Sequence, residues 1–328
     1  MTARKLKLRA EYAGLKLLFI LIGLLPWSLA VKCGELLGFA MTKVIVKRFK
    51  RTISDIHKAF PKKSKKEVNA IALESWRNIG RMAGEVIKAQ TMSADKILEK
   101  LEFRNLDNMF QSNQRGESGL LHIGHFTNWE LFGLVATTKL KKAAFIARPM
   151  SNPMVDEMLT KMRKSSGSEI ISAYNPFFSC FKALKKGTMI GILSDQSVPS
   201  AKMYMNFMGR PAEVAPMTAM LSLKMNVPVY PVRVFRENGK IVAEGEAPIY
   251  PPQGEYSHQL LFDYTAQLKD KYEEWIKKDP ASWLWGHNRW KREKDCIKFM
   301  KIQDEEMRLE AQKAAAKKAE KEGAENAL

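Results

Sequence analysis

Residues 119–132 read GLLHIGHFTNWELF, and this stretch contains the transition that decides the fold. Its first five residues form a short, mainly apolar run, which is typical of a strand buried in a parallel sheet. Thr127 and Asn128 both suit the N-cap position of a helix, and mainly apolar residues follow them. The stretch therefore predicts a strand, a turn that carries His125, and a helix.

Similar transitions recur along the chain. Further short apolar runs occupy residues 143–147, 169–173, 189–194 and 227–235. The segments between them have room for helices, an arrangement that is typical of βαβ units. Asn238-Gly239 separates two apolar stretches and predicts a tight hairpin. We expect an α/β fold, in which flanking helices cover a mostly parallel sheet with one antiparallel hairpin.

Helical patterns lie on both sides of this core. Apolar residues recur at three- and four-residue steps over 68–87, and Ser64 with Glu67 predicts a capping box before them. A second amphipathic helix is expected after Ser257. Residues 301–328 are rich in Ala, Lys and Glu, and they indicate a charged tail that is helical or disordered.

The amino-terminal segment is the most apolar part of the chain. Residues 17–31 carry no charge, whereas a spanning helix needs about 20 apolar residues. Pro26 is expected to break or kink this helix. Basic residues flank the segment on both sides, which favours a helical hairpin or an interfacial helix over a single crossing. A signal peptide and a buried core helix remain alternatives.

The charge balance restricts the possible partners. The chain has 54 Lys and Arg against 35 Asp and Glu, a net charge of +19, and residues 1–100 hold an excess of +13. Such a surface attracts a polyanion: a nucleic acid, an anionic bilayer, a phosphorylated lipid or an acidic carrier protein. The three cysteines are widely spaced, which argues against a disulfide framework or a cysteine-rich zinc site.

Two histidines lie in the deciding stretch. His125 precedes the expected helix, and Glu130 would lie in its first turn, so the two can form a dyad for general-base catalysis on a hydroxyl. His122 lies within the expected strand and is interpreted as a structural residue. A metal site formed by His122, His125 and Glu130 stays open, although no further ligand cluster is present.

Five motifs resemble those of one family. Residues 124–131 form a His-x4-Glu block, and the other four blocks are Arg148-Pro-Met-Ser-Asn-Pro153, Leu193-Ser-Asp-Gln196, Asn206-Phe-Met-Gly209 with Ala215-Pro216, and Trp285-Gly-His-Asn-Arg-Trp-Lys291. In order and spacing they resemble the bacterial lipid A biosynthesis acyltransferases, the late lauroyl and myristoyl transferases. The likeness covers roughly residues 10–292.

The resemblance implies an O-acyltransferase. Such an enzyme would move a fatty acyl chain from an acyl carrier protein thioester, or from acyl-CoA, to a hydroxyl of a phosphorylated lipid A precursor. It would work at the cytoplasmic face of the bacterial inner membrane, bound to anionic lipids. The resemblance implies no metal, no other cofactor and no nucleic acid partner.

The resemblance also assigns roles to particular residues. His125 would act as the base, and Glu130 would stabilise its imidazolium form. The expected substrate-binding residues are Arg148, Asp195, Gln196, His287 and Arg289. The chain departs from the family at Met208, where a phenylalanine is usual, and at His287-Asn288-Arg289, where consecutive arginines are more common. These departures would affect the acyl-chain fit and the phosphate contacts.

Three alternatives accompany this interpretation. A glycerophospholipid acyltransferase would usually carry Asp in place of Glu130 and a Glu-Gly-Thr-Arg block, whereas this chain has Ser194-Asp-Gln-Ser197. An acyltransferase acting on a mannoside or an aminolipid would use the same dyad. A non-catalytic membrane protein that binds anionic lipid or RNA would need only the basic amino terminus.

The sequence predicts three parts. Residues 1–50 are expected to form a membrane-associated helical anchor, residues 51–300 an α/β acyltransferase domain, and residues 301–328 the charged tail.

Overall fold

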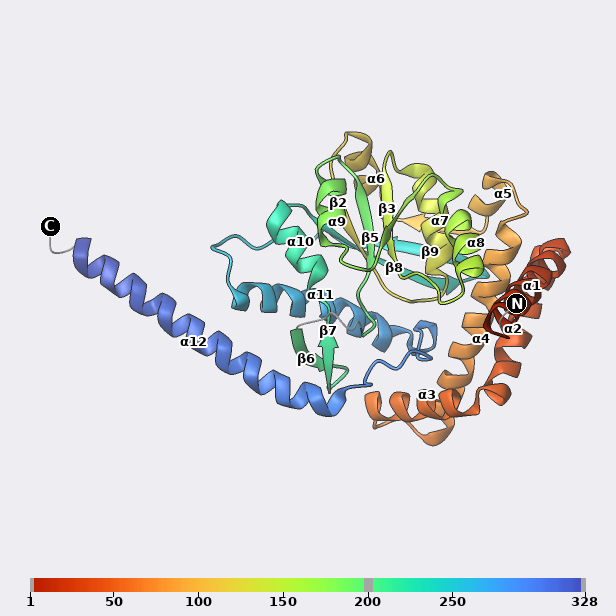
Figure 1. Cartoon of the computed structure of the whole chain (residues 1–328), viewed down its shortest axis with the longest axis horizontal. Coiled ribbons are helices and arrows are strands. Elements are labelled where there is room, and N and C mark those ends of the chain that lie inside the picture. The colour runs from red at the N-terminus through yellow and green to blue at the C-terminus, as the bar shows by residue number, and fades with distance from the viewer. Residues whose placement is uncertain (1–2, 198–202, 326–328) are drawn as a thin grey trace.

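The computed structural model describes residues 3–197 and 203–325, and its core is a sheet with helices on both faces (Figure 1). The sheet has seven strands in the order β1-β9-β8-β2-β5-β3-β4. They are β1 (Leu101–Arg104), β2 (Gly119–Ile123), β3 (Ala143–Ala147), β4 (Glu169–Ser172), β5 (Met189–Leu193), β8 (Val229–Glu237) and β9 (Lys240–Gly245). Strands β8, β2, β5, β3 and β4 run parallel. The predicted mostly parallel α/β fold is confirmed.

The predicted hairpin is also confirmed. Strands β8 and β9 are antiparallel, and they are joined through Asn238 and Gly239 with φ of 49° and 76°. Two successive positive φ angles are typical of the type I′ turn that matches the twist of the strands. Strand β1 pairs with β9, and the sequence analysis did not predict this strand.

A second, two-stranded sheet was not predicted either. It consists of β6 (Met203–Phe207) and β7 (Arg210–Val214) and lies apart from the main sheet. Its turn is Met208-Gly209, which lacks the Asn-Gly or Asp-Gly signal, and Met208 adopts a φ of 51°. This explains why the hairpin could not be recognised from its turn residues.

The other regular elements of the described chain are helices. They are α1 (Ala3–Leu24), α2 (Trp27–Val44), α3 (Val46–Ala59), α4 (Lys65–Ala89), α5 (Ala94–Leu98), α6 (Asp107–Gln114), α7 (Trp129–Lys139), α8 (Pro153–Lys164), α9 (Phe177–Leu184), α10 (Met217–Met225), α11 (His258–Lys278), the 3₁₀ turn η1 (Pro280–Ser282) and α12 (Glu293–Glu325). The predicted capping box of Ser64 and Glu67 begins α4. The helix expected after Ser257 is α11, and the Ser257 side chain caps it.

Alternation along β2 places its apolar residues in two separate core clusters. Leu121 and Ile123 pack with buried residues of α4, α6, α7 and α8. Leu120 faces the opposite side and packs with residues of α9, α10 and α11. Because successive strand residues point to opposite faces, the apolar run at 119–123 holds the two helical layers to one sheet.

Helices α2 and α4 pack with their backbones nearly in contact. A Cβ atom on Gly34 would overlap the carbonyl oxygen of Gly80, and one on Gly80 would overlap the carbonyl oxygen of Gly34. Gly38 and Gly84 meet the facing helix in the same way. Only residues without a side chain allow this approach, so these glycines determine the helix spacing.

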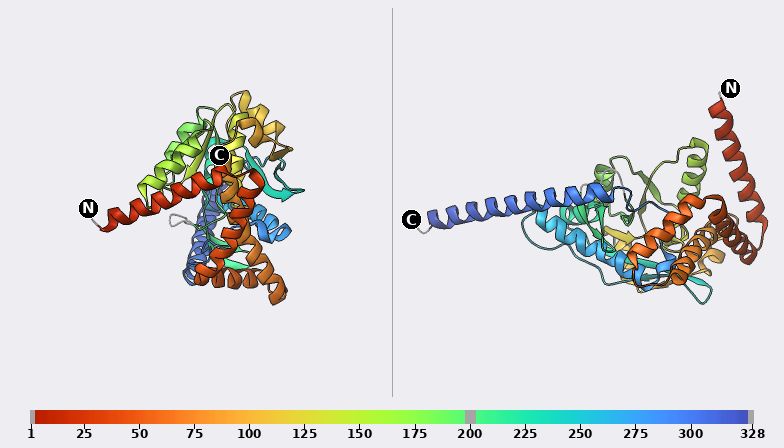
Figure 2. Two further views of the ribbon diagram at one scale, coloured as in Figure 1. Left: turned by 90° about the vertical axis from the view of Figure 1, so that its right-hand side faces the viewer. Right: turned by 90° about the horizontal axis from the view of Figure 1, so that it is seen from below.

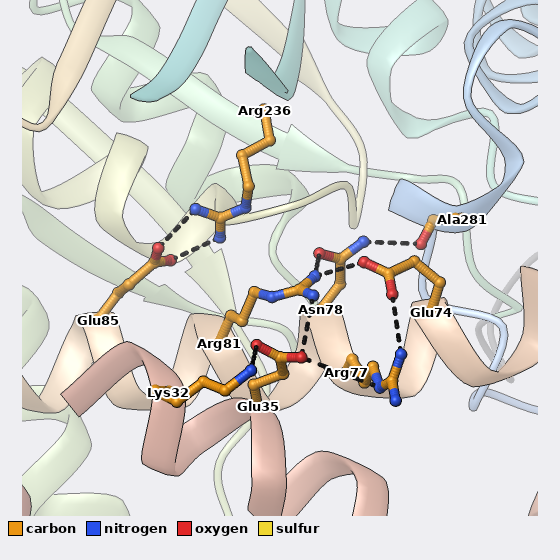
Figure 3. Close-up of polar contacts among 9 residues, drawn as sticks. All are labelled: Lys32, Glu35, Glu74, Arg77, Asn78, Arg81, Glu85, Arg236 and Ala281. Carbon is orange, nitrogen blue, oxygen red and sulfur yellow. Dashed lines mark hydrogen bonds and ion pairs between the residues drawn. The ribbon is translucent and has the colours of Figure 1, made fainter. Parts of the chain in front are cut away.

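Charged residues flank this contact along the two helices (Figure 3). Glu35 of α2 lies 3.5 Å from Arg81 Nη2 of α4, and Arg81 also binds Glu74. Lys32 and Arg77 complete the group around Glu35. These partly exposed ion pairs fix the register of two helices that pack mainly through glycine.

The amino-terminal helices leave many apolar side chains exposed. Helix α1 ends at Leu24 and α2 begins after Pro26, as the predicted break requires. Figure 2 shows α1 projecting from the body of the molecule. None of the helices in residues 3–197 and 203–325 is long and apolar enough to cross a membrane.

The carboxyl-terminal segment is a helix that extends away from the body (Figures 1 and 2). Helix α12 begins at Glu293, before the predicted boundary at 301. The side chain of Gln303 accepts from the Tyr204 amide and donates to the Tyr204 carbonyl, both at 2.9 Å. This part of α12 therefore pairs with the free edge of β6.

We expect Gly80→Ala to lower the free energy of unfolding by about 1–3 kcal/mol, because the new methyl group would force α2 and α4 apart. Urea unfolding followed by circular dichroism measures the change. Gly14→Ala is the matched control, since no atom lies within 4 Å of its added Cβ. That variant should gain up to about 1 kcal/mol in helix propensity. Equal effects of the two variants would contradict the proposed packing constraint.

Candidate active site

The register of two parallel strands brings the central residues of the site together. Ile123 of β2 pairs with Leu193 of β5, and each strand ends there. Two residues further along the chain stand His125 and Asp195. His125 Nδ1 lies 2.8 Å from Asp195 Oδ1, and the His125 amide donates to Asp195 Oδ2 at 3.1 Å. The carboxyl ends of adjacent parallel strands therefore form this pair, as is typical of α/β ligand sites.

The pair determines which imidazole nitrogen can act as a base. An ionised carboxylate only accepts hydrogen bonds, so Nδ1 of His125 carries the proton and donates it to Asp195. His125 Nε2 has no hydrogen-bond partner within residues 3–197 and 203–325. The side chain of His125 is 24% exposed, so a substrate can reach Nε2.

Asp195 remains ionised despite complete burial. Burial alone would raise its pKa, but the charge of His125 and hydrogen bonds from His125 and Trp283 outweigh it and lower the pKa below its usual value. Trp283 Nε1 donates to Oδ2 at 2.7 Å. Asp195 therefore holds His125 in one orientation and can stabilise its imidazolium form.

The predicted contact between Glu130 and His125 is wrong. Glu130 instead binds Arg163 of α8, with Arg163 Nε 3.0 Å from Oε2 and Nη2 2.5 Å from Oε1. Glu130 lies in the first turn of α7, where its side chain points towards α8. Arg163 was not among the predicted site residues, because a partner on another helix leaves no local spacing signal.

The loop after η1 covers the other side of the His125 turn. The Leu284 amide donates to the His125 carbonyl at 3.0 Å, and the Thr127 amide donates to the Ser282 carbonyl at 2.9 Å. His287 belongs to this loop, and desolvation followed by the charge of His125 lowers its pKa. The predicted motif at 285–291 thus lies beside His125.

The remaining predicted residues fall into two groups. Arg148 follows β3 and is exposed, so it can contact a ligand at the sheet edge. Gln196 is buried, and its Nε2 lies 3.3 Å from Asp195 Oδ2 and 3.4 Å from the Leu284 carbonyl. Gln196 therefore supports Asp195 from within the protein.

Arg289 belongs to the buried group. It is only 2% exposed, its guanidinium lies 4.6 Å from the centre of the Phe207 ring, and burial lowers its pKa to about 10. None of its side-chain nitrogens has a hydrogen-bond partner within the described residues. Arg289 therefore lies inside the protein and not on the exposed surface of the site.

His122 is structural, as interpreted from the sequence. Its Nε2 donates to the Leu268 carbonyl at 2.9 Å, and its ring stacks on Tyr272. Burial lowers the pKa of His122 to about 4. Strand alternation thus separates His122 from His125 and its Asp195 partner.

Several known lipid acyltransferases are similar to this chain. The family model described as bacterial lipid A biosynthesis acyltransferase matches residues 2–292. A phosphatidylinositol mannoside acyltransferase of Mycolicibacterium smegmatis is 18% identical over 220 residues, which cover 66% of this chain and 71% of that protein. The crystal structure of a 1-acyl-sn-glycerophosphate acyltransferase from Thermotoga maritima is 14% identical, covers 71% of this chain and 95% of its own, and gives a TM-score of 0.36.

The buried neutral His122 predicts acid sensitivity. An unfolded histidine binds a proton below a pKa of about 6.5, whereas folded His122 stays neutral down to about 4. The unfolded state therefore binds more protons in this window, and stability falls as the pH falls through it. Through His122, we expect a loss of about 2 kcal/mol in the free energy of unfolding between pH 7 and pH 5.

Urea unfolding at both pH values, followed by tryptophan fluorescence, measures this loss. His122→Gln is neutral throughout and should lose correspondingly less stability between the two pH values. Parallel pH profiles for the wild type and this variant would refute the assignment.

Proposed function

This chain belongs to the bacterial lipid A biosynthesis acyltransferase family, and on that basis we propose that it acylates a hydroxyl of a lipid A precursor. The donor would be a thioester of acyl carrier protein or of coenzyme A. The observation that carries the proposal is the pair of His125 and Asp195, which leaves Nε2 free and accessible. A base in this arrangement suits a hydroxyl nucleophile.

The proposed reaction needs no covalent acyl-enzyme. The acceptor oxygen attacks the thioester carbonyl carbon while His125 Nε2 takes the hydroxyl proton. The C–S bond then breaks as the ester forms, and the departing thiolate takes the proton from the imidazolium. Asp195 stabilises the imidazolium through Nδ1–H. His125 thus returns to its neutral form, and a free thiol leaves.

The other candidate residues have different roles in this proposal. Arg148 and His287 would bind acceptor phosphates or steady the developing oxyanion. Glu130 stays a candidate catalytic residue, now as half of an ion pair with Arg163 instead of the partner of His125. Gln196 and Arg289 would support the site from the interior.

The charge of the chain suits these partners. A net charge of +19 attracts a phosphorylated glycolipid and an acidic carrier protein. The alternative acceptor with a specific observation in its favour is another glycolipid, since the mycobacterial relative is a phosphatidylinositol mannoside acyltransferase. A chain-wide match to the lipid A family favours the first acceptor.

We also propose that α1 and α2 dock the enzyme on the cytoplasmic face of the bacterial inner membrane. Exposed apolar residues of these helices are Leu17, Ile20, Leu21, Leu24, Leu29, Leu36, Leu37, Phe39, Met41 and Val44. Exposed cations on the same helices are Arg4, Lys5, Lys7, Lys16, Lys32 and Lys43. Apolar side chains together with Lys and Arg are typical of helices that lie in the surface of an anionic bilayer.

We expect His125→Ala to lower kcat/KM for acyl transfer by about a hundredfold to ten-thousandfold, because the general base is lost. Purified protein would be incubated with acyl carrier protein thioesters and a diphosphorylated lipid A precursor, and the product mass followed in detergent. The wild type should add one acyl chain. His258→Ala is the matched control, since that side chain is 71% exposed, and it should keep full activity.

Two results would count against the proposal. Full activity of folded His125→Ala would remove His125 as the base. Failure of the wild type to acylate the precursor would remove the lipid A assignment, and a screen of membrane glycolipids, aminolipids and lysophospholipids would then identify another acceptor or no transfer at all.

Membrane docking is tested with phosphatidylglycerol vesicles. We expect Leu36→Glu to weaken vesicle binding about tenfold, because burial of one leucine side chain stabilises by about 1.5–3 kcal/mol. Leu309→Glu on α12 is the control, since Leu309 is exposed to a similar extent, 44% against 56%. Equal binding by the two variants would show that α2 does not face the bilayer.

A further inference from the structure

One face of α4 forms hydrogen bonds with the loop that covers His125. Ser75 Oγ donates to the Trp283 carbonyl at 2.7 Å. Asn78 Nδ2 donates to the Ala281 carbonyl at 3.0 Å, as Figure 3 shows. Glu85 lies seven residues after Asn78, which is about two helical turns and therefore the same face. Glu85 thus lies on the same face of α4 as Ser75 and Asn78, which faces the site.

Glu85 is a buried carboxylate with three polar contacts. Its side chain is 1% exposed. Arg236 of β8 binds it through both terminal nitrogens, with Nη1 2.6 Å from Oε1 and Nη2 2.9 Å from Oε2 (Figure 3). Asn128 Nδ2 donates to Oε2 at 2.8 Å. The ion pair accounts for the charge of Glu85, but the bond to Asn128 reaches the turn that carries His125.

Asn128 has a defined task in that turn. Its Oδ1 accepts from the Leu131 amide at 2.9 Å and so caps α7. An asparagine amide can cap a helix only when its oxygen faces the helix, and the carboxylate of Glu85 attracts the NH₂ end to the opposite side. Glu85 therefore selects the orientation of Asn128 that begins α7 directly after the His125 turn.

The turn itself needs such support. Thr127 adopts a φ of 46°, which is unfavourable for a β-branched residue and persists only where the surroundings hold it. The Thr127 amide binds the Ser282 carbonyl on one side, and Asn128 binds Glu85 on the other. The backbone between these two contacts sets the direction of the His125 side chain.

We infer that Glu85 is a positioning residue for His125 and that it acts through Asn128. This inference rests on the proposed function, in which His125 is the base. Arg236 binds the carboxylate of Glu85 from β8, and the separate bond from Asn128 to Oε2 of Glu85 orients the turn. Loss of the bond should misalign Nε2 without removing any group that contacts the substrate.

The test combines activity with hydrogen exchange of residues 124–131. We expect Glu85→Ala and Asn128→Ala each to lower kcat about tenfold to a hundredfold, with KM nearly unchanged, because a small misplacement of the base affects mainly the chemical step. Both variants should exchange amide hydrogens faster in this segment. The double variant should lose no more activity than the worse single variant, because each substitution already removes the same hydrogen bond between Glu85 and Asn128.

Three further variants separate positioning from stability. Glu85→Gln keeps an acceptor oxygen for Asn128, so exchange of residues 124–131 and kcat should stay close to wild type even if Glu85→Ala fails to fold. Arg236→Lys keeps the bond to Asn128, so the protein should lose stability to urea while the segment exchanges normally. Glu74→Gln, at a partly exposed ion pair of the same helix, should leave kcat unchanged.

Several outcomes would overturn the inference. Multiplicative losses in the double variant would mean that Glu85 and Asn128 act independently. Normal exchange of residues 124–131 in folded Glu85→Ala, or an equal loss of kcat in Arg236→Lys, would reduce Glu85 to a structural ion pair. Exchange is measured without substrate, so it tests the positioning even if the wild type proves unable to transfer an acyl chain.

Discussion

The site depends on a buried carboxylate whose oxygens must all be satisfied. An ionised group inside a protein is costly unless neighbouring donors replace water, and Asp195 receives them from the His125 ring, the His125 amide and the Trp283 indole. These donors come from the turn after β2 and the loop after η1. The hydrogen bonds to this one carboxylate therefore join three segments that are far apart in the chain.

Helix α4 gives this assembly its rigidity. One side of the helix meets α2 through glycines, and another side supplies Ser75, Asn78 and Glu85 to the loops around His125. A helix held this closely by a neighbour has little freedom to shift, so its polar groups present fixed partners. The exposed apolar helix α2 and the turn that carries His125 thus share one structural support, although they lie on opposite sides of it.

Local patterns in the sequence predicted most of the fold. Apolar runs of five to nine residues, the Ser64 capping box and the Asn238-Gly239 turn are signals contained within a few residues, and the structure has each of them. Asp195 and Gln196 were expected to bind substrate, and they directly follow the apolar run at 189–194. The partner of His125 was misassigned. Its identity depends on which strand lies beside β2, and the local spacing of residues does not determine strand order.

The same limit explains the other omissions. Arg163, Glu85 and Asn128 take these roles from contacts with residues of other elements. In the sequence alone, each of them is an ordinary charged or capping side chain. Strand β1 is only four residues long, so the alternation of Leu101-Glu102-Phe103-Arg104 is too short to stand out. A sequence therefore shows which reactive or polar side chains a segment carries. Which of them contact one another across helices and strands depends on how the core packs.

The pairing of Gln303 with Tyr204 has a consequence for how molecules of this chain behave towards each other. A two-stranded sheet leaves the outer edge of β6 with unpaired backbone groups, which can accept a strand from another chain. The amide of Gln303 occupies one such donor and acceptor pair as a neighbouring strand would. Helix α12 thus shields β6 from edge-to-edge aggregation, a protective task that its charged composition does not reveal.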